Sequence, residues 1–169
     1  MGGEQGTGNR EQVCPDAIEA LADAISVYEG YWKSGTRANR NRNPGNLRPI
    51  LRSQPRDEGG YRIFHSLCEG YGALCGDLEI KFAGHSRSGL KPDSTLAELI
   101  AVWAPAADSN DPKRYAAFVA QWLTVALGRP ITPETWLSQI KDLRQPDPRR
   151  ARGQAPPKSV AAQSQEDAA

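Results

Sequence analysis

Residues 24–33 read Ala-Ile-Ser-Val-Tyr-Glu-Gly-Tyr-Trp-Lys, and they place a single carboxylate, Glu29, where an apolar helix is expected to end. The helix is predicted to begin at Pro15, because proline is favoured at the first helical position. Apolar residues then recur at helical spacing, at Ile18, Leu21, Ala22, Ile25 and Tyr28. Gly30 is the type of residue that commonly follows the last turn of a helix. Glu29 is therefore predicted to be the last residue of this helix.

The neighbours of Glu29 suggest a chemical role. Tyr28, Tyr31 and Trp32 surround it in the sequence, and an apolar, aromatic environment raises the pKa of a carboxyl group. The partial negative charge at the C-terminus of a helix acts in the same direction. A carboxylic acid that stays protonated near neutral pH can donate a proton to a glycosidic oxygen. The alternative is an exposed glutamate that merely ends a helix.

A polar segment, residues 33–60, follows this helix and shows no helical period. It contains the turn-forming run Asn43-Pro44-Gly45-Asn46 and the pair Gly59-Gly60. Two extended pieces are expected, at about 46–50 and about 61–64, and together they would form an antiparallel hairpin with a long loop.

The remaining ordered chain is predicted to be helical. Three expected helices have recognisable start and stop signals, which are Ser66 to Glu69 with Gly84, Thr95 to Glu98 with Pro105, and Asp111-Pro112 with Gly128. A last helix is expected to start at Thr132-Pro133. The predicted fold class is therefore mostly α (α+β), with one small antiparallel β-hairpin after the first helix. A length of 169 residues suits one domain, which we place at residues 14–143.

Both ends of the chain are expected to be unstructured. Residues 1–13 are rich in glycine and polar side chains, and residues 144–169 are rich in Pro, Gln, Ala and charge with a single Val. The N-terminus has no apolar stretch of the kind that forms a signal peptide, and no run of 18 apolar residues occurs in the chain. We expect a protein without membrane insertion that is cytoplasmic until release, or associated with a virion.

Neither the histidines nor the cysteines are arranged to bind a metal or to form a redox site. His65 and His85 lack metal-ligand spacing, and no cofactor is expected. Cys68 and Cys75 would lie on one helix face with their Cα atoms roughly 10 Å apart, too far for a disulfide. Cys14, the third cysteine, makes the number odd, so all three are interpreted as reduced thiols.

The net charge of the chain is only +1, but the basic residues are unevenly distributed. Residues 33–62 hold eight basic and two acidic side chains, a patch that is typical either of a solvated loop or of a surface for an anionic partner. Nucleic acid is not expected, because no RNA- or DNA-binding motif accompanies the arginines.

Four motifs, occurring in order over residues 17–130, resemble those of phage- and prophage-associated lysozyme-like proteins of the lytic transglycosylase type. The family's usual runs are EGY followed by RNNNPGNLR, then FxVFxSxExGxxAL, TLAEIIxxWAP and NDTxxYxxxV. The corresponding residues here are 28–31 with 40–48, 62–74, 95–105, and 110–112 with Tyr115 and Val119. This chain departs from the pattern at Arg42, where the family usually has a third asparagine.

The resemblance implies a lysozyme-like superfamily fold and cleavage of the glycan strand of peptidoglycan, as a lytic transglycosylase or muramidase. The protein is expected to be a monomer. By similarity, Glu29 matches the single catalytic glutamate at the end of the first helix. Substrate-binding candidates are Asn43, Asn46, Arg48 and Tyr115, since amides and hydroxyls pair with sugar groups. Asn43 and Asn46 have the alternative role of turn formation, Tyr115 of core packing, and Arg48 of an internal pair.

Two alternatives concern the chemistry. A hydrolase would need a second carboxylate, for which Asp57 and Glu58 lie on the expected hairpin but in a glycine-rich turn. A chain with only one suitable glutamate favours transglycosylation, in which the N-acetyl group of the substrate assists. The other alternative is a non-catalytic virion, tail or cell-wall-binding protein that keeps the fold.

Overall fold

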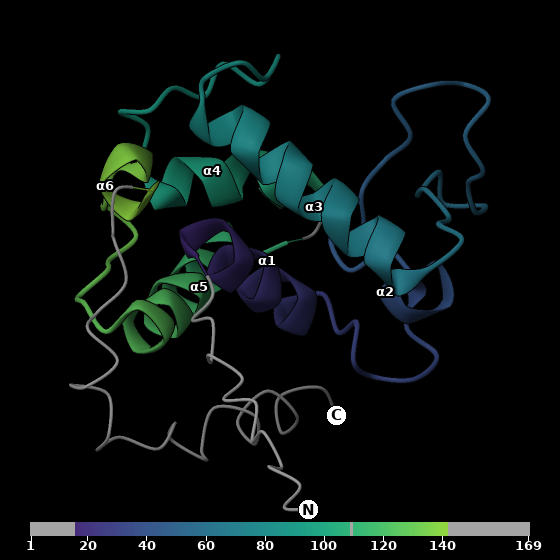
Figure 1. Cartoon of the computed structure of the whole chain (residues 1–169), viewed down its shortest axis with the longest axis horizontal. Coiled ribbons are helices and arrows are strands. Elements are labelled where there is room, and N and C mark those ends of the chain that lie inside the picture. The colour runs from purple at the N-terminus through teal and green to yellow at the C-terminus, as the bar shows by residue number, and fades with distance from the viewer. Residues whose placement is uncertain (1–15, 109, 142–169) are drawn as a thin grey trace, which may run out of the picture.

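The computed structural model describes residues 16–108 and 110–141, in which six α-helices and one short 3-10 helix are joined by turns (Figure 1). The elements are α1 (Ala17–Tyr28), α2 (Arg37–Arg40), α3 (Leu67–Phe82), α4 (Leu96–Trp103), η1 (Ala106–Asp108), α5 (Pro112–Leu127) and α6 (Leu137–Lys141). The predicted mostly helical class is confirmed. The unstructured ends expected at residues 1–13 and 144–169 lie outside the described residues.

Helix α1 is the central helix. In Figure 1 it lies between α3 and α5, and it contacts both of them as well as α6. It is buried on most of its circumference because small and aliphatic side chains alternate along it, among them Leu21, Ala22, Ala24 and Ile25, none of which is exposed. Alanines in such a helix allow neighbouring helices to approach closely, whereas at the end of α1 Tyr28 is exposed and Glu29 is partly buried.

The helix boundaries follow the predicted signals in most places. Thr95 and Glu98 form the reciprocal capping box expected at the start of α4. Asp111 caps α5 with Pro112 in its first turn, and Gly128 ends α5 in the left-handed conformation. At α3, Ser66 caps as expected, but the Glu69 side chain accepts from the backbone N–H of His65 instead of Ser66, so that box is incomplete.

The predicted β-hairpin after the first helix is wrong. The described residues contain no β-strand, and the segment has a single isolated antiparallel bridge, between Arg56 and Arg62. Pro49 and Pro55 cannot donate ladder hydrogen bonds. Turns and side-chain hydrogen bonds therefore hold the segment together, and it projects beside the helices (Figure 1).

Two further differences concern short helices. Helix α2 was not expected, because its four residues are too few to show a helical period; Thr36 caps it. The last helix begins at Leu137 instead of at Thr132-Pro133. The carbonyl groups of Pro133 and Thr135 accept hydrogen bonds from Ala97 and Leu96 at the start of α4, at 2.7 and 2.9 Å, so this stretch docks against α4 before the helix begins.

No helix within the described ranges combines the length and the apolar character that crossing a membrane requires.

Candidate functional site

The Glu29 carboxylate lies where three distant segments meet. Its backbone N–H donates to the Ile25 carbonyl at 2.9 Å, so the residue caps the C-terminus of α1. One carboxylate oxygen accepts a hydrogen bond from the Asn46 amide at 2.6 Å, and the other accepts from the Tyr115 hydroxyl at 3.1 Å. The turn after α2 and the first part of α5 thus hold the acid at the end of α1 in one orientation.

The protonation of Glu29 is set by two opposing effects. Burial disfavours the charged form and raises the pKa of the carboxyl group above its ordinary value. Hydrogen bonds from Asn46 and Tyr115, with a contribution from the Trp103 side chain, favour the charged form but do not cancel the effect of burial. The group is therefore a stronger candidate for a proton donor near neutral pH than an exposed glutamate.

Asn46 has the backbone conformation of a turn residue, but its side chain does more than form the turn. Its backbone has a φ of 48°, in the left-handed region that asparagine tolerates better than most residues. Its amide nitrogen is used by Glu29, while its side-chain oxygen is buried and has no hydrogen-bond partner among the described residues. A buried acceptor without a donor is unfavourable, so this oxygen is an unsatisfied hydrogen-bonding group beside the acid.

Tyr115 packs in the core, which is the alternative that the sequence left open, and it does not line the cleft. The ring is buried in the core and stacks on Tyr28, with 3.6 Å between the ring centroids and 14° between the planes. Burial and the nearby Glu29 raise the pKa of the hydroxyl well above its ordinary value, so it remains a donor. The stacking fixes the ring, and the ring in turn fixes the hydroxyl at Glu29.

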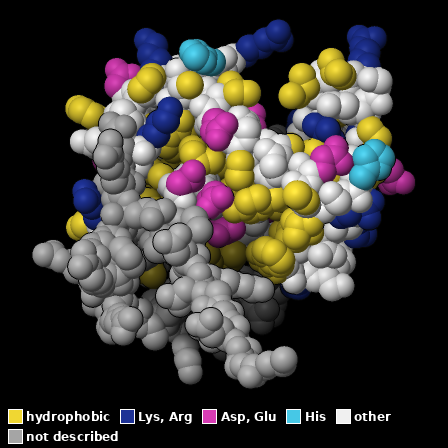
Figure 2. All heavy atoms as spheres, viewed as in Figure 1, with side chains coloured by type: hydrophobic (Ala, Val, Ile, Leu, Met, Phe, Trp, Pro, Cys, Tyr) yellow, Lys and Arg dark blue, Asp and Glu magenta, His cyan; other side chains and the backbone are white. Residues whose placement is uncertain are grey.

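Glu29 and Asn46 line a cleft of about 880 Å³. One wall is the turn segment 45–51 with Tyr61, and the other is formed by α3, the loop after it and the end of α4. Figure 2 shows the lobe that carries the first wall set apart from the helical body at the upper right. The size of the cleft suits an extended chain of small rings.

The cleft has a second acid that the sequence interpretation missed. Asp77 on α3 lines it, one helical turn before Lys81, and the two form an ion pair. The Lys81 ammonium also lies over the Trp103 ring, 5.4 Å from its centroid. An i,i+4 acid–base pair on a helix is a pattern that sequence inspection can find, although it does not reveal which face meets a cleft.

Neither acid that the sequence offered as a second carboxylate lines the cleft. Asp57 is occupied within its own loop by the Asn41 amide, the Tyr61 backbone N–H and Arg37, whose guanidinium nitrogen is 3.5 Å away. Partial burial raises the pKa of Asp57, but these hydrogen bonds and the Arg37 charge outweigh it and hold the pKa below its usual value. Glu58 is exposed.

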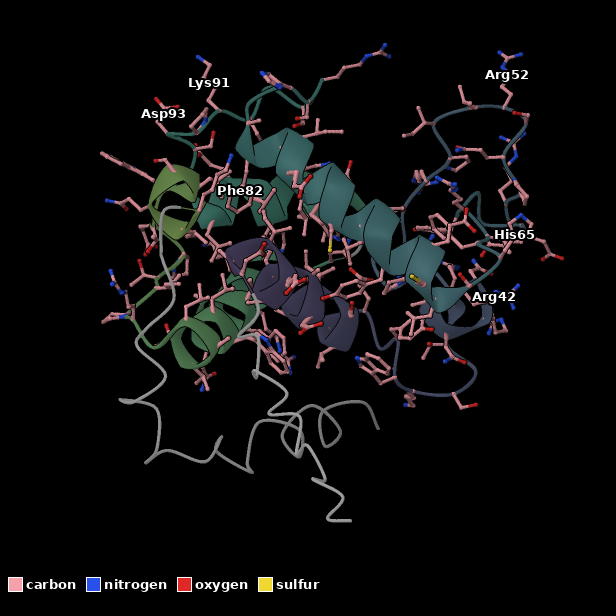
Figure 3. The ribbon with its side chains drawn as sticks, in the orientation of Figure 1. Arg42, Arg52, His65, Phe82, Lys91 and Asp93 are labelled. Carbon is pink, nitrogen blue, oxygen red and sulfur yellow. The ribbon has the colours of Figure 1, made fainter. Side chains whose placement is uncertain are left out.

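Asn43 lies in the same turn as Asn46, but it does not line the cleft. It is fully buried, its amide nitrogen donates to the carbonyls of Leu47 and Arg62, and its oxygen accepts from the Leu47 N–H. All of these bonds tie the turn together, which is the structural role that the sequence left open. Arg42 likewise lies at the base of the turn, where its side chain donates to the Phe64 carbonyl at 2.6 Å (Figure 3).

Arg48 does line the cleft, and Tyr61 and Gly59 hold its side chain in place. Its guanidinium lies over the Tyr61 ring, 4.6 Å from the centroid, and donates to the Gly59 carbonyl at 3.4 Å. No carboxylate in the described part of the chain pairs with it. The arrangement leaves guanidinium N–H groups available to an anionic ligand.

Within residues 16–108 and 110–141 no group of three His, Cys, Asp or Glu side chains could hold a metal ion, and Cys68 and Cys75 are free thiols. Burial raises the pKa of the Cys75 thiol to about 11, as suits a side chain packed against the core. No family model, curated protein or solved structure matches this chain.

Proposed function

We propose that the protein cleaves the glycan strand of peptidoglycan, with Glu29 as the proton donor. The observation that carries the proposal is the partly buried carboxyl group of raised pKa, oriented by Asn46 and Tyr115 on the wall of a cleft. The motif resemblance supplies the lysozyme-like fold and the substrate class as part of the same proposal.

The first step uses the acid form of Glu29. It donates its proton to the glycosidic oxygen while the bond from that oxygen to the sugar C1 breaks, and positive charge develops on the ring. The N-acetyl group of the substrate stabilises this charge. The Glu29 carboxylate then takes the proton of the muramic acid 6-hydroxyl as that oxygen bonds to C1, which closes an anhydro ring and restores the acid.

Transglycosylation is favoured over hydrolysis because the described residues lining the cleft supply no second unpaired carboxylate beside Glu29. Among the described lining residues the carboxylates are Glu29 and Asp77, and Asp77 is already paired with Lys81. In the same proposal the unpartnered Asn46 oxygen accepts from a sugar hydroxyl or acetamide N–H. Arg48 binds a carboxylate of the lactyl group or the stem peptide.

The decisive experiment is the turbidity of purified peptidoglycan during incubation with the protein, followed by mass spectrometry of the released fragments. Anhydro-muramic ends support transglycosylation, and reducing ends would assign hydrolysis instead. If the wild-type protein clears nothing but still sediments with peptidoglycan, the enzymatic proposal fails and a non-catalytic wall-binding role replaces it.

The rate of cleavage is expected to depend on pH through Glu29. Proton donation needs the acid form, so activity is lost as the pH rises through the pKa of this group. Because burial raises that pKa, activity persists to a higher pH than an exposed glutamate would allow. Initial rates measured from pH 4 to 9 check this, and a fall that is complete by pH 5 would contradict it.

Tyr115→Phe is expected to lower the rate at the optimum about tenfold, because the carboxyl group loses one of the two bonds that orient it. The lost bond favoured the charged form, so the alkaline fall in the rate should move to higher pH. Tyr71→Phe is the matched control, since that hydroxyl bonds to Asp23 on α1. Equal effects of the two substitutions would contradict the role given to Tyr115.

A further inference from the structure

The mouth of the cleft has an unusual concentration of exposed aliphatic side chains. Ile50 is 86% exposed and Leu51 is 61% exposed, and on the opposite wall Ile80 and Val102 are 50% and 40% exposed. Nine large hydrophobic side chains are exposed in the described part of the chain, and these four all line one cleft. Figure 2 shows hydrophobic atoms gathered on the tip of the projecting lobe.

The exposure of Ile50 and Leu51 is built into the loop. The Gln54 side-chain oxygen accepts from the backbone N–H groups of Ile50 and Leu51 at 2.8 and 3.1 Å, and the Gln54 N–H donates to the Leu51 carbonyl at 3.1 Å. Prolines at 49 and 55 restrict the backbone on both sides. The backbone of the tip is thus satisfied within the loop, while its two aliphatic side chains remain in solvent.

Cations surround these aliphatic groups. Arg48 and Arg56 flank the tip, and Arg52 points outward from it (Figure 3). Lys81 and Arg87 lie on the opposite wall of the cleft. Asp77 and Lys81 pair with each other, so Arg48, Arg52, Arg56 and Arg87 outnumber Glu29, the other acid that lines the cleft, and the mouth has a surplus of positive charge.

We propose that this mouth, defined as residues 48–56 together with Ile80 and Val102, docks on the surface of an anionic phospholipid bilayer. The aliphatic side chains would enter the boundary between headgroups and acyl chains, and Arg52 and Arg56 would pair with lipid phosphates. Such docking is shallow and reversible, and it does not require the chain to span the bilayer. The docking proposal does not rest on the proposed function, because it is argued from the exposed side chains and charges at the mouth and not from Glu29.

Sedimentation of the full-length Glu29→Gln protein with lipid vesicles tests this docking separately from catalysis. We expect binding to vesicles of mixed phosphatidylglycerol and phosphatidylcholine and at least tenfold weaker binding to phosphatidylcholine alone. The double variant Ile50→Ser/Leu51→Ser is expected to weaken binding at least about tenfold, since each aliphatic side chain loses its apolar burial. Arg52→Gln is expected to weaken it about fivefold at low salt.

Val125→Ser is the matched control, because Val125 is 52% exposed on α5 and does not line the cleft. On anionic vesicles the Ile50→Trp variant should show a larger blue shift of its tryptophan emission than the Val125→Trp variant. Equal loss of binding in the Val125→Ser variant would overturn the proposal, as would displacement from vesicles by millimolar inorganic phosphate alone. Retention on insoluble peptidoglycan that requires Ile50 and Leu51, without vesicle binding, would assign the mouth to glycan instead.

Discussion

Glu29→Gln is expected to lower the rate of peptidoglycan cleavage by about 10³-fold, because an amide cannot supply the proton that the leaving oxygen needs. Glutamine has almost the same shape and keeps an oxygen that accepts from Tyr115 or Asn46, so the cleft should be preserved. The rate of fragment release, followed by mass spectrometry, measures the effect. Clearing at the wild-type rate would remove Glu29 from the mechanism.

The same substitution has an expected effect on stability with the opposite sign. The folded-state pKa of Glu29 is raised, so its contribution to the free energy of unfolding is fully present below the ordinary pKa and is lost as the pH rises through the folded-state value. At pH 7 to 8 the glutamine variant should therefore melt above the wild type, by about 4 °C for each kcal/mol recovered. Below about pH 4 the difference should vanish.

Glu58→Gln is the control for that measurement, since Glu58 is exposed and does not line the cleft. It should leave the melting temperature at pH 7 to 8 unchanged. A glutamine variant at position 29 that melts below the wild type at every pH would mean that the carboxylate is held by stabilising hydrogen bonds more than it is penalised by burial.

How much of this site follows from the sequence depends on the range of the interactions involved. The end of α1 could be predicted because its determinants, an apolar period and Gly30, are local. The hydrogen bond between Glu29 and Tyr115 joins residues 86 positions apart, and it depends on the packing of α1 against α5. The motif resemblance suggested Tyr115, but local sequence signals do not predict that its hydroxyl lies within hydrogen-bond distance of Glu29.

Asn43 and Asn46 illustrate the limit more sharply. Both are asparagines of one Asn-Pro-Gly-Asn turn, and both can either form a turn or bind a ligand. The structure separates them because the Asn43 side chain points into the turn and satisfies three backbone groups there. The Asn46 side chain points to Glu29. That difference arises from how the turn sits against α3, which neither residue type nor spacing encodes.

The packing of this turn against α3 gives the second prediction with a large effect. Gly70 lies in the first turn of α3, and a Cβ atom there would be 1.9 Å from the Arg42 carbonyl oxygen and 3.1 Å from the Pro44 ring. Both neighbours belong to the turn that carries Asn46. Since a backbone carbonyl cannot be relieved by a rotamer change, the helix and the turn must separate.

Gly70→Ala is therefore expected to lower the free energy of unfolding by about 2–3 kcal/mol, even though alanine favours a helix by about 1 kcal/mol. Gly76→Ala on the same helix is the matched control, because a Cβ atom there meets nothing within 4 Å; it should raise the free energy of unfolding by about 0.5–1 kcal/mol. Urea unfolding measures both, and equal stabilisation by the two substitutions would contradict the close contact.

Activity should respond to Gly70→Ala more strongly than stability alone requires. Under conditions where the variant is still fully folded, displacing the turn moves the Asn46 amide away from the Glu29 oxygen, to which it is now only 2.6 Å distant. Loss of that bond raises the pKa of Glu29 further and releases the carboxyl group from its fixed orientation. The rate at the optimum should then fall by about tenfold or more, with the alkaline fall at higher pH. Gly70 thus acts on Glu29 indirectly. Because it has no side chain, the turn that carries Asn46 can pack closely against α3, and this places the Asn46 amide at the Glu29 carboxylate.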